Sequence, residues 1–186
     1  MKPLLAFFVL MVESMALASL IAVEIQNRTV IAILAAPVRM FDLLLSKTIF
    51  GTLLAFSQAL LLLLLIGALG QNALILITFL LLGGIMMTGI ALISGAAGKD
   101  FMNTLFYSMF FLIPLIIPTF SVLFPGSASI WIKIMPTYGL VEGIMRASVY
   151  GHGWLDVLPF LLMIVAWNIV ILTAGLLIFK NRIQKL

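Results

Sequence analysis

The segment Val23–Lys47, VEIQNRTVIAILAAPVRMFDLLLSK, separates two long apolar runs and carries five charged side chains. They are Glu24, Arg28, Arg39, Asp42 and Lys47. The spacing predicts an amphipathic helix that leaves the first apolar run and ends at Pro37, because proline does not continue a helix. The chain then returns into the second apolar run.

The composition excludes a soluble globular domain. Hydrophobic residues make up 65% of the 186 residues and charged residues 9%, with a mean hydropathy of +1.33. Soluble domains carry about 25% charged residues. The apolar runs are unbroken, whereas the strands of a transmembrane β-barrel alternate between apolar and polar residues. The sequence therefore predicts an all-α, polytopic membrane protein that forms one transmembrane domain over residues 1–186.

Five apolar runs are long enough to cross a bilayer, which takes about 20 residues in a helix. The predicted spans are 3–23, 49–69, 73–95, 102–124 and 157–179. Seven of the ten basic residues fall in the segment 24–47, in the third loop and in the C-terminal tail. Cytoplasmic loops carry an excess of Lys and Arg. We therefore expect these three segments, including the C-terminus, on the cytoplasmic side of the cell membrane.

In this orientation the N-terminus lies outside the cell. Two explanations for this position remain open. The run has features of a cleaved signal peptide, with Lys2, an apolar stretch and an Ala16-Leu17-Ala18 site. Alternatively, the chain lacks a span that would precede this run. The topology of the following segments is the same in both cases.

Residues 125–156 are too polar to span the membrane and too apolar for an ordinary loop. We expect two short helices at the outer surface, broken at Met135-Pro136 and dipping into the membrane. Trp and Tyr in this segment favour the headgroup level, and irregular backbone at membrane depth must be shielded by protein. Glu142 and Arg146 have the i, i+4 spacing of an ion pair on one helix face.

The sequence predicts no catalytic site and no metal site on this chain. It has no Cys and one His, His152, and it contains neither H-E-x-x-H nor G-x-S-x-G. The stretch 95–100, GAAGKD, lacks the glycine spacing and the Ser or Thr of a phosphate-binding loop. The net charge of +4 comes from basic residues beside the spans. It therefore indicates contact with lipid headgroups and not with nucleic acid.

Polar, glycine and proline residues interrupt the apolar runs. Glu13 is the one carboxylate within a predicted span, and ionisable groups at such positions are functional candidates by default. A proton-coupled carrier usually needs a network of them. Gly83 and Gly89 predict close helix packing. Pro114 and Pro118 predict a kink or a break in the fourth run.

Two motifs in this order resemble the export permeases of the type-2 ABC transporter family. Those permeases carry E-x-x-x-G-T-x-x-x-L-L-x-x-P followed by a Lys. The matching residues here are Glu24, Thr29, Leu34, Pro37 and Lys47, with Arg28 in place of the Gly. The stretch Met135–Arg146 resembles the family's segment before the last span at Pro136, Tyr138, Glu142 and Arg146.

The resemblance implies a subunit of six spans whose first span is missing here, with a cytoplasmic coupling helix and re-entrant outer helices before the last span. It implies that a separate ATP-binding cassette ATPase binds ATP and Mg²⁺ and contacts the loop 24–47. The coupling residues would be Glu24, Arg28, Thr29, Leu34 and Pro37. Arg39 and Lys47 would anchor the segment to headgroups. A second permease subunit, identical or different, would complete the path.

We therefore expect a non-enzymatic translocation subunit of an ATP-driven exporter. An apolar path without charged rings suits a drug, a lipid or a lipid-linked molecule as substrate. Two alternatives from other classes remain open. One is a structural or assembly subunit without a transport path, and the other is a secondary carrier that uses Glu13.

Overall fold

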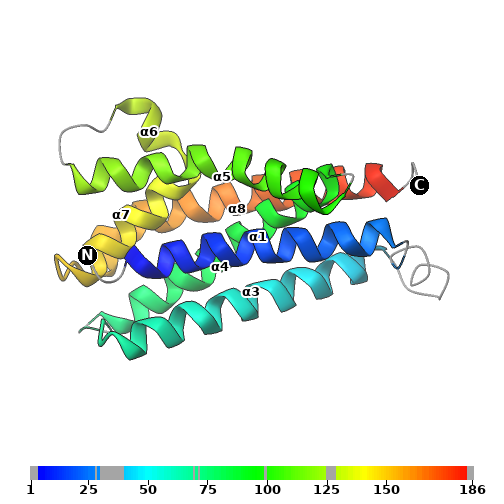
Figure 1. Ribbon diagram of the computed structural model, residues 1–186. Helices are drawn as coiled ribbons and strands as arrows, with labels where there is room; N and C mark the ends of the chain where they lie inside the picture. Colours follow the sequence, from blue (N-terminus) through cyan, green and yellow to red (C-terminus); the bar gives the residue numbers. More distant parts are fainter. Residues whose placement is uncertain are drawn as a thin grey trace.

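The computed structural model describes residues 4–27, 29, 40–68, 70, 72–98, 100–124 and 129–183. Within these residues the chain is helical and has no strand, which confirms the all-α fold (Figure 1). The helices are α1 (Leu4–Gln26), α3 (Met40–Leu65), α4 (Ala73–Ala97), α5 (Phe101–Leu123), α6 (Ile130–Ile134), α7 (Pro136–Ser148) and α8 (Trp154–Ile183). Five of them, α1, α3, α4, α5 and α8, are long and apolar enough to cross a membrane.

The observed helices are longer than the apolar runs, and this changes the extent of the first loop. Helix α1 continues to Gln26, and α3 begins at Met40, nine residues before the predicted span. Ser46 and Thr48 are polar residues within this helix. Their hydroxyls donate to the Leu43 and Leu44 carbonyls, at 2.8 and 2.9 Å, and so remain within the helix. Residues 40–47 are therefore part of a membrane helix and not of a loop.

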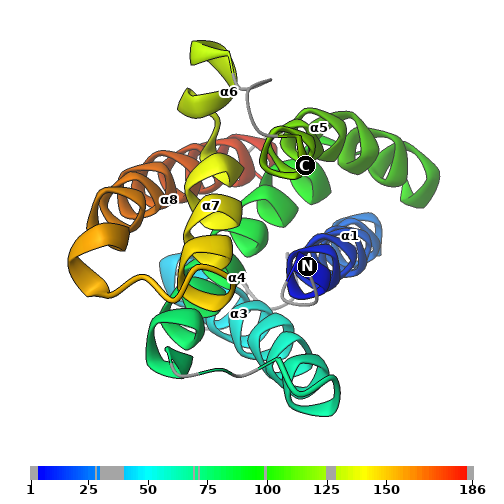
Figure 2. The same ribbon diagram turned by 90° about the vertical axis from the view of Figure 1, so that its left-hand side faces the viewer.

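Helix α4 is the centre of the bundle. It contacts α1, α3, α5, α7 and α8, which surround it in the end-on view of Figure 2. Small residues make this arrangement possible. A Cβ added to Gly95 would lie 2.8 Å from the Ala18 carbonyl oxygen of α1, and one added to Gly89 would lie 2.8 Å from Ile171 Cγ2 of α8. The glycines of α4 therefore serve close helix packing, as the sequence predicted.

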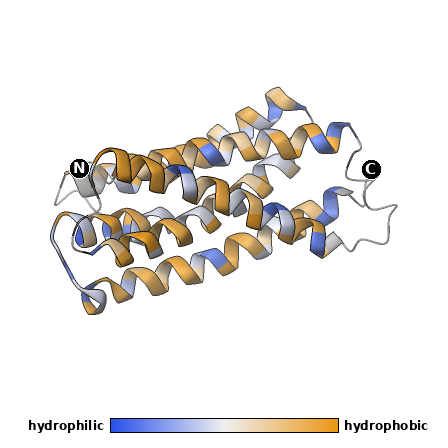
Figure 3. Ribbon diagram, turned by 90° about the horizontal axis from the view of Figure 1, so that it is seen from below, coloured by the Kyte–Doolittle hydropathy of each residue, from blue (hydrophilic) through white to orange (hydrophobic). Residues whose placement is uncertain are grey.

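The bundle has two ends of different composition. The end of α1, the start of α3 and the end of α8 lie together at one end, with Lys47, Lys180 and Arg182 (Figure 1). We call this the basic end. The opposite end holds the start of α1, the end of α3 and the link between α7 and α8. Apolar residues occupy most of the length between them (Figure 3).

Two buried clusters hold the bundle together. The larger one combines residues of α1, α3, α4, α5, α7 and α8. The smaller one lies near the basic end and joins α1, α3, α4 and α8. Its buried members are Leu17, Ala18, Ile21, Ile25, Leu43, Leu44, Ala91, Leu92, Ala96 and Phe179. Four helices are therefore packed together near the basic end of the bundle.

Helix α5 runs from Phe101 to Leu123 with Pro114 and Pro118 inside it, so of the predicted kink or break the break does not occur. A proline removes one hydrogen bond of the ladder, but the neighbouring turns keep the helix continuous when other groups bond the freed carbonyls. Pro114 and Pro118 remove the bonds to the Phe110 and Pro114 carbonyls. The Leu115 carbonyl, next to Pro114, accepts a hydrogen bond from Thr137 of α7 at 2.7 Å. This bond joins α5 to α7.

Candidate functional site

The first candidate site is the segment 24–47, for which the sequence predicted a coupling role. Of its five predicted residues, Glu24 and Thr29 are described, whereas Arg28, Leu34 and Pro37 lie outside the described residues, as does Arg39. Thr29 is helical and exposed. The expected Glu24–Arg28 pair is therefore not tested.

The Glu24 carboxylate instead forms an ion pair with the Lys47 ammonium of α3. The side chain of Lys47 is 13% exposed and that of Glu24 is 27% exposed. The predicted contact of Lys47 with lipid headgroups is not tested by this pair. Helix α3 starts at Met40, which places Lys47 inside the helix, beside the last turns of α1.

This ion pair lies beside the smaller buried cluster. Ile21 and Ile25 of α1, with Leu43 and Leu44 of α3, are buried next to it in sequence, and Phe179 of α8 belongs to the same cluster. Exposed ion pairs contribute about 0–1 kcal/mol to stability. Removal of one partner of a more buried pair costs more, because the other charge remains without a partner. The pair therefore fixes α1 against α3 at the point where the charged segment begins.

The second candidate site is the outer segment, where the chain forms α6 and α7 as predicted, with a break at Met135. Met135 has an extended backbone, with φ −62° and ψ 143°. This is the conformation that a following proline imposes. Pro136 is then the first residue of α7, where a missing N–H costs nothing.

The break lies beside the middle of two spans and not at an end of the bundle. The Trp167 indole of α8 donates to the Ile134 carbonyl at 3.0 Å, and the Thr137 hydroxyl donates to the Leu115 carbonyl of α5 at 2.7 Å. Trp167 and Leu115 lie well within their helices. The two bonds satisfy backbone carbonyls on either side of the break, as irregular backbone at membrane depth requires. Sequence reasoning predicted the break but missed both donors.

The chain belongs to the ABC-2 transporter family. The family model, described as ABC-2 family transporter protein, matches residues 2–179. The match confirms the resemblance and covers the spans, the coupling segment and the outer segment. Comparison with curated proteins and with solved structures gave no match.

In this ABC-2 family chain, Tyr138, Glu142 and Arg146 share one face of α7. Arg146 Nε donates to Glu142 Oε1 at 2.9 Å, so the i, i+4 pair exists. The Arg146 guanidinium lies over the Phe160 ring of α8, 4.8 Å from its centroid, and the Tyr138 ring lies 6.3 Å from the same centroid. Phe160 is therefore the residue that both Arg146 and Tyr138 contact, and no local sequence pattern indicates it.

The charges of this face act on Tyr138. Burial raises the pKa of the Tyr138 phenol, the Glu142 carboxylate raises the pKa further, and the Arg146 guanidinium opposes both. The phenol therefore stays protonated at neutral pH and can donate a hydrogen bond.

The other faces of α7 fit tightly against α4 and α8. A Cβ added to Gly143 would lie 2.1 Å from the Phe79 ring of α4, and one added to Gly139 would lie 3.1 Å from the Phe160 carbonyl oxygen. The Asn72 side chain also donates to the Ala147 carbonyl at 3.3 Å. Helix α7 is therefore held to its neighbours along its whole length.

The two sites of this ABC-2 transporter chain lie at opposite ends of the same helices. Glu24 and Lys47 are at the basic end, and the link from α7 to α8 is at the other (Figure 1). Helices α4 and α8 contribute to the cluster beneath the ion pair and also contact α7. These two helices therefore contact residues of both sites. Among the described residues, no group of three potential metal ligands occurs.

Proposed function

We propose that this chain is the permease subunit of an ATP-driven exporter in the cell membrane. A separate ATP-binding cassette ATPase would bind ATP and Mg²⁺ and would contact the segment 24–47. A second permease subunit would complete the path. Membership of the ABC-2 family supports the transport role. The Glu24–Lys47 ion pair on the smaller buried cluster is the observation that carries the coupling role.

The basic end is the cytoplasmic end in this proposal. The described residues there include Lys47, Lys180 and Arg182, and the positive-inside rule favours that side for them. The ATPase would push on the residues between α1 and α3. Because Glu24 and Lys47 join these two helices above a buried cluster, the push would move α1, α3, α4 and α8 together.

The outer segment would respond to this movement. Helix α7 contacts α4, α5 and α8, and Thr137 and Trp167 fasten the break before α7 to two of the spans. A shift of α8 relative to α5 would therefore change the position of the break. Such a change could open the outer half of the path. The apolar character of the spans favours a drug, a lipid or a lipid-linked molecule as substrate.

The experiment that tests this function is purification of the tagged full chain in mild detergent from membranes in which it is naturally expressed. We expect an ATPase with an ATP-binding cassette sequence to co-purify, and ATP to drive export after reconstitution of the complex. Efficient export by the chain without any ATPase would contradict the proposal and would favour a secondary carrier.

A further inference from the structure

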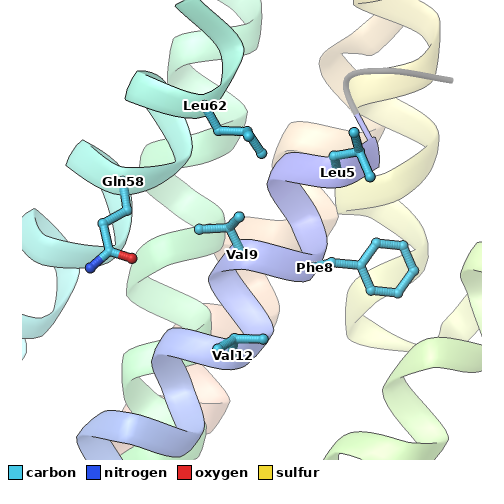
Figure 4. A pocket seen from close by; sticks show the side chains of 6 residues that line it. All are labelled: Leu5, Phe8, Val9, Val12, Gln58 and Leu62. Atoms are coloured by element: carbon cyan, nitrogen blue, oxygen red, sulfur yellow. The ribbon is translucent and has the colours of Figure 1, made fainter. Parts of the chain in front are cut away.

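A groove runs between α1 and α3 on the surface of the bundle. Its first part is lined by Leu5, Phe8, Val9, Val12, Gln58 and Leu62 and has a volume of about 350 Å³. Figure 4 shows Gln58 and Leu62 of α3 across this hollow from Val9 of α1. The second part is lined by Glu13, Ala16, Leu17, Leu20, Phe50, Gly51 and Leu54 and has a volume of about 130 Å³.

The two hollows are consecutive lengths of one groove. On α3 the lining positions 50, 54, 58 and 62 are four residues apart, which is one helix face. On α1 the hollows meet where Val12 lines one and Glu13 lines the other. The first hollow alone falls within the range of about 300–1,000 Å³ that is typical of small-molecule sites.

Glu13 stands out among the six acidic residues of the chain, because the other five have local roles. Glu24 and Glu142 form ion pairs, and Asp100 caps α5 by accepting from the Asn103 backbone N–H at 2.8 Å. The remaining two, Asp42 and Asp156, lie in the first turns of α3 and α8, where a carboxylate favours the helix dipole. Glu13 lies near the middle of α1, and with the described residues it forms no hydrogen bond or ion pair.

An ionisable group at this depth is unfavourable without a partner and normally faces a site that supplies one. Glu13 is half-buried at the floor of an otherwise apolar groove, and Gln58 adds an exposed amide dipole farther along it. Both polar groups can orient a positive charge, whereas the remaining lining residues accept apolar groups. The groove lacks a basic side chain that would attract an anion.

We propose that the α1–α3 groove binds a lipophilic cation, with the Glu13 carboxylate opposite its positive charge. The inference rests on the proposed transport function and names the substrate class for it. A molecule of this class partitions into the membrane and enters the groove from the lipid side. The apolar walls bind its hydrocarbon part, and Glu13 distinguishes it from neutral and anionic molecules of the same shape.

Two probe ions of matched size and opposite charge test this proposal. The full chain is placed in nanodiscs of uncharged lipid, and the binding of tetraphenylphosphonium and of tetraphenylborate is measured above that of empty nanodiscs. We expect protein-dependent binding of the cation and little of the anion. Glu13→Gln keeps the side-chain shape and removes the charge, so it should weaken cation binding about tenfold.

Two further variants control the interpretation. Asp156→Asn removes a carboxylate of α8 that does not line the groove and should leave cation binding unchanged. Val12→Trp fills the hollow beside Gln58 and should abolish cation binding without removing a charge. Equal protein-dependent binding of the two ions, or unchanged cation affinity in Glu13→Gln, would overturn the proposal. Because no ATPase is present in this assay, such a failure is separate from failure of the ATPase to co-purify.

Discussion

The Glu24 carboxylate of α1 and the Lys47 ammonium of α3 form an ion pair that joins the two ends of the charged segment. The two residues are 23 positions apart in sequence, and the pair holds the end of α1 beside the start of α3. Any force applied to the segment therefore reaches α1 and α3 together. The buried residues Ile25 and Leu44 lie close to the two charges in sequence.

The ion pair should contribute measurably to stability. Glu24→Lys places two ammonium groups together, and we expect it to lower the free energy of unfolding by about 1–2 kcal/mol, between the values for exposed and buried pairs. The double exchange Glu24→Lys with Lys47→Glu restores opposite charges and should recover most of the loss. Unfolding in mixed detergent micelles measures this. If the double exchange costs the sum of the two single variants, the residues do not interact.

The break before α7 should depend on Thr137. Thr137→Val keeps the side-chain shape but removes the donor to the Leu115 carbonyl, and we expect a loss of about 1–3 kcal/mol because a buried acceptor is left unsatisfied. Thr78→Val is the matched control, since the Thr78 hydroxyl bonds only the Leu74 carbonyl of its own helix on an exposed face. Equal stability of the two variants in the same unfolding assay would show that the Thr137 bond does not hold the break.

The packing of α7 on α4 should tolerate no methyl group at Gly143. The added Cβ would lie 2.1 Å from the Phe79 ring, so Gly143→Ala should destabilise the bundle by about 1–3 kcal/mol. Gly153→Ala serves as control, because nothing lies within 4 Å of the added atom there. Phe79→Leu in the Gly143→Ala background should recover part of the loss. A Gly143→Ala variant as stable as Gly153→Ala would contradict the observed packing.

The orientation can be tested with single cysteines, because the chain has none of its own. The distribution of basic residues predicts that a cysteine at Lys99 reacts with a membrane-impermeant reagent from the cytoplasm, and one at Ser127 from outside. Ser148→Cys, in the last turn of α7, should react from the same side as Ser127→Cys. Labelling of Ser127→Cys from the cytoplasm alone would reverse the topology and remove the coupling assignment.

Features that depend on neighbouring residues in the chain were predictable. Apolar run length predicted five spans, Pro136 predicted the break between α6 and α7, and the i, i+4 spacing predicted the Glu142–Arg146 pair. These features follow from covalent geometry and from the helix period. The start of α3 was missed because the charged residues Asp42 and Lys47 placed residues 40–47 in the segment between the spans, whereas they lie within the helix.

Contacts between helices were not predictable in the same way. The partner of Glu24 is Lys47, and the ring beneath Arg146 belongs to Phe160. Both depend on which helices lie side by side and in what register. Trp167 is one aromatic residue among many in an apolar span, and its bond to the Ile134 carbonyl appears only when α6 and α8 are placed in space. A single sequence carries no local signal for such relationships.

The central claim is that the segment beginning at Glu24 couples an ATPase to export. The most direct test compares Glu24→Lys with a tail control, Lys185→Glu, at equal amounts of folded protein in the membrane. We measure ATP-driven export and the amount of ATPase that co-purifies. The account predicts that Glu24→Lys inserts normally but loses export and retains less ATPase, whereas Lys185→Glu behaves as the parent. Normal export and normal ATPase retention in Glu24→Lys would contradict the claim.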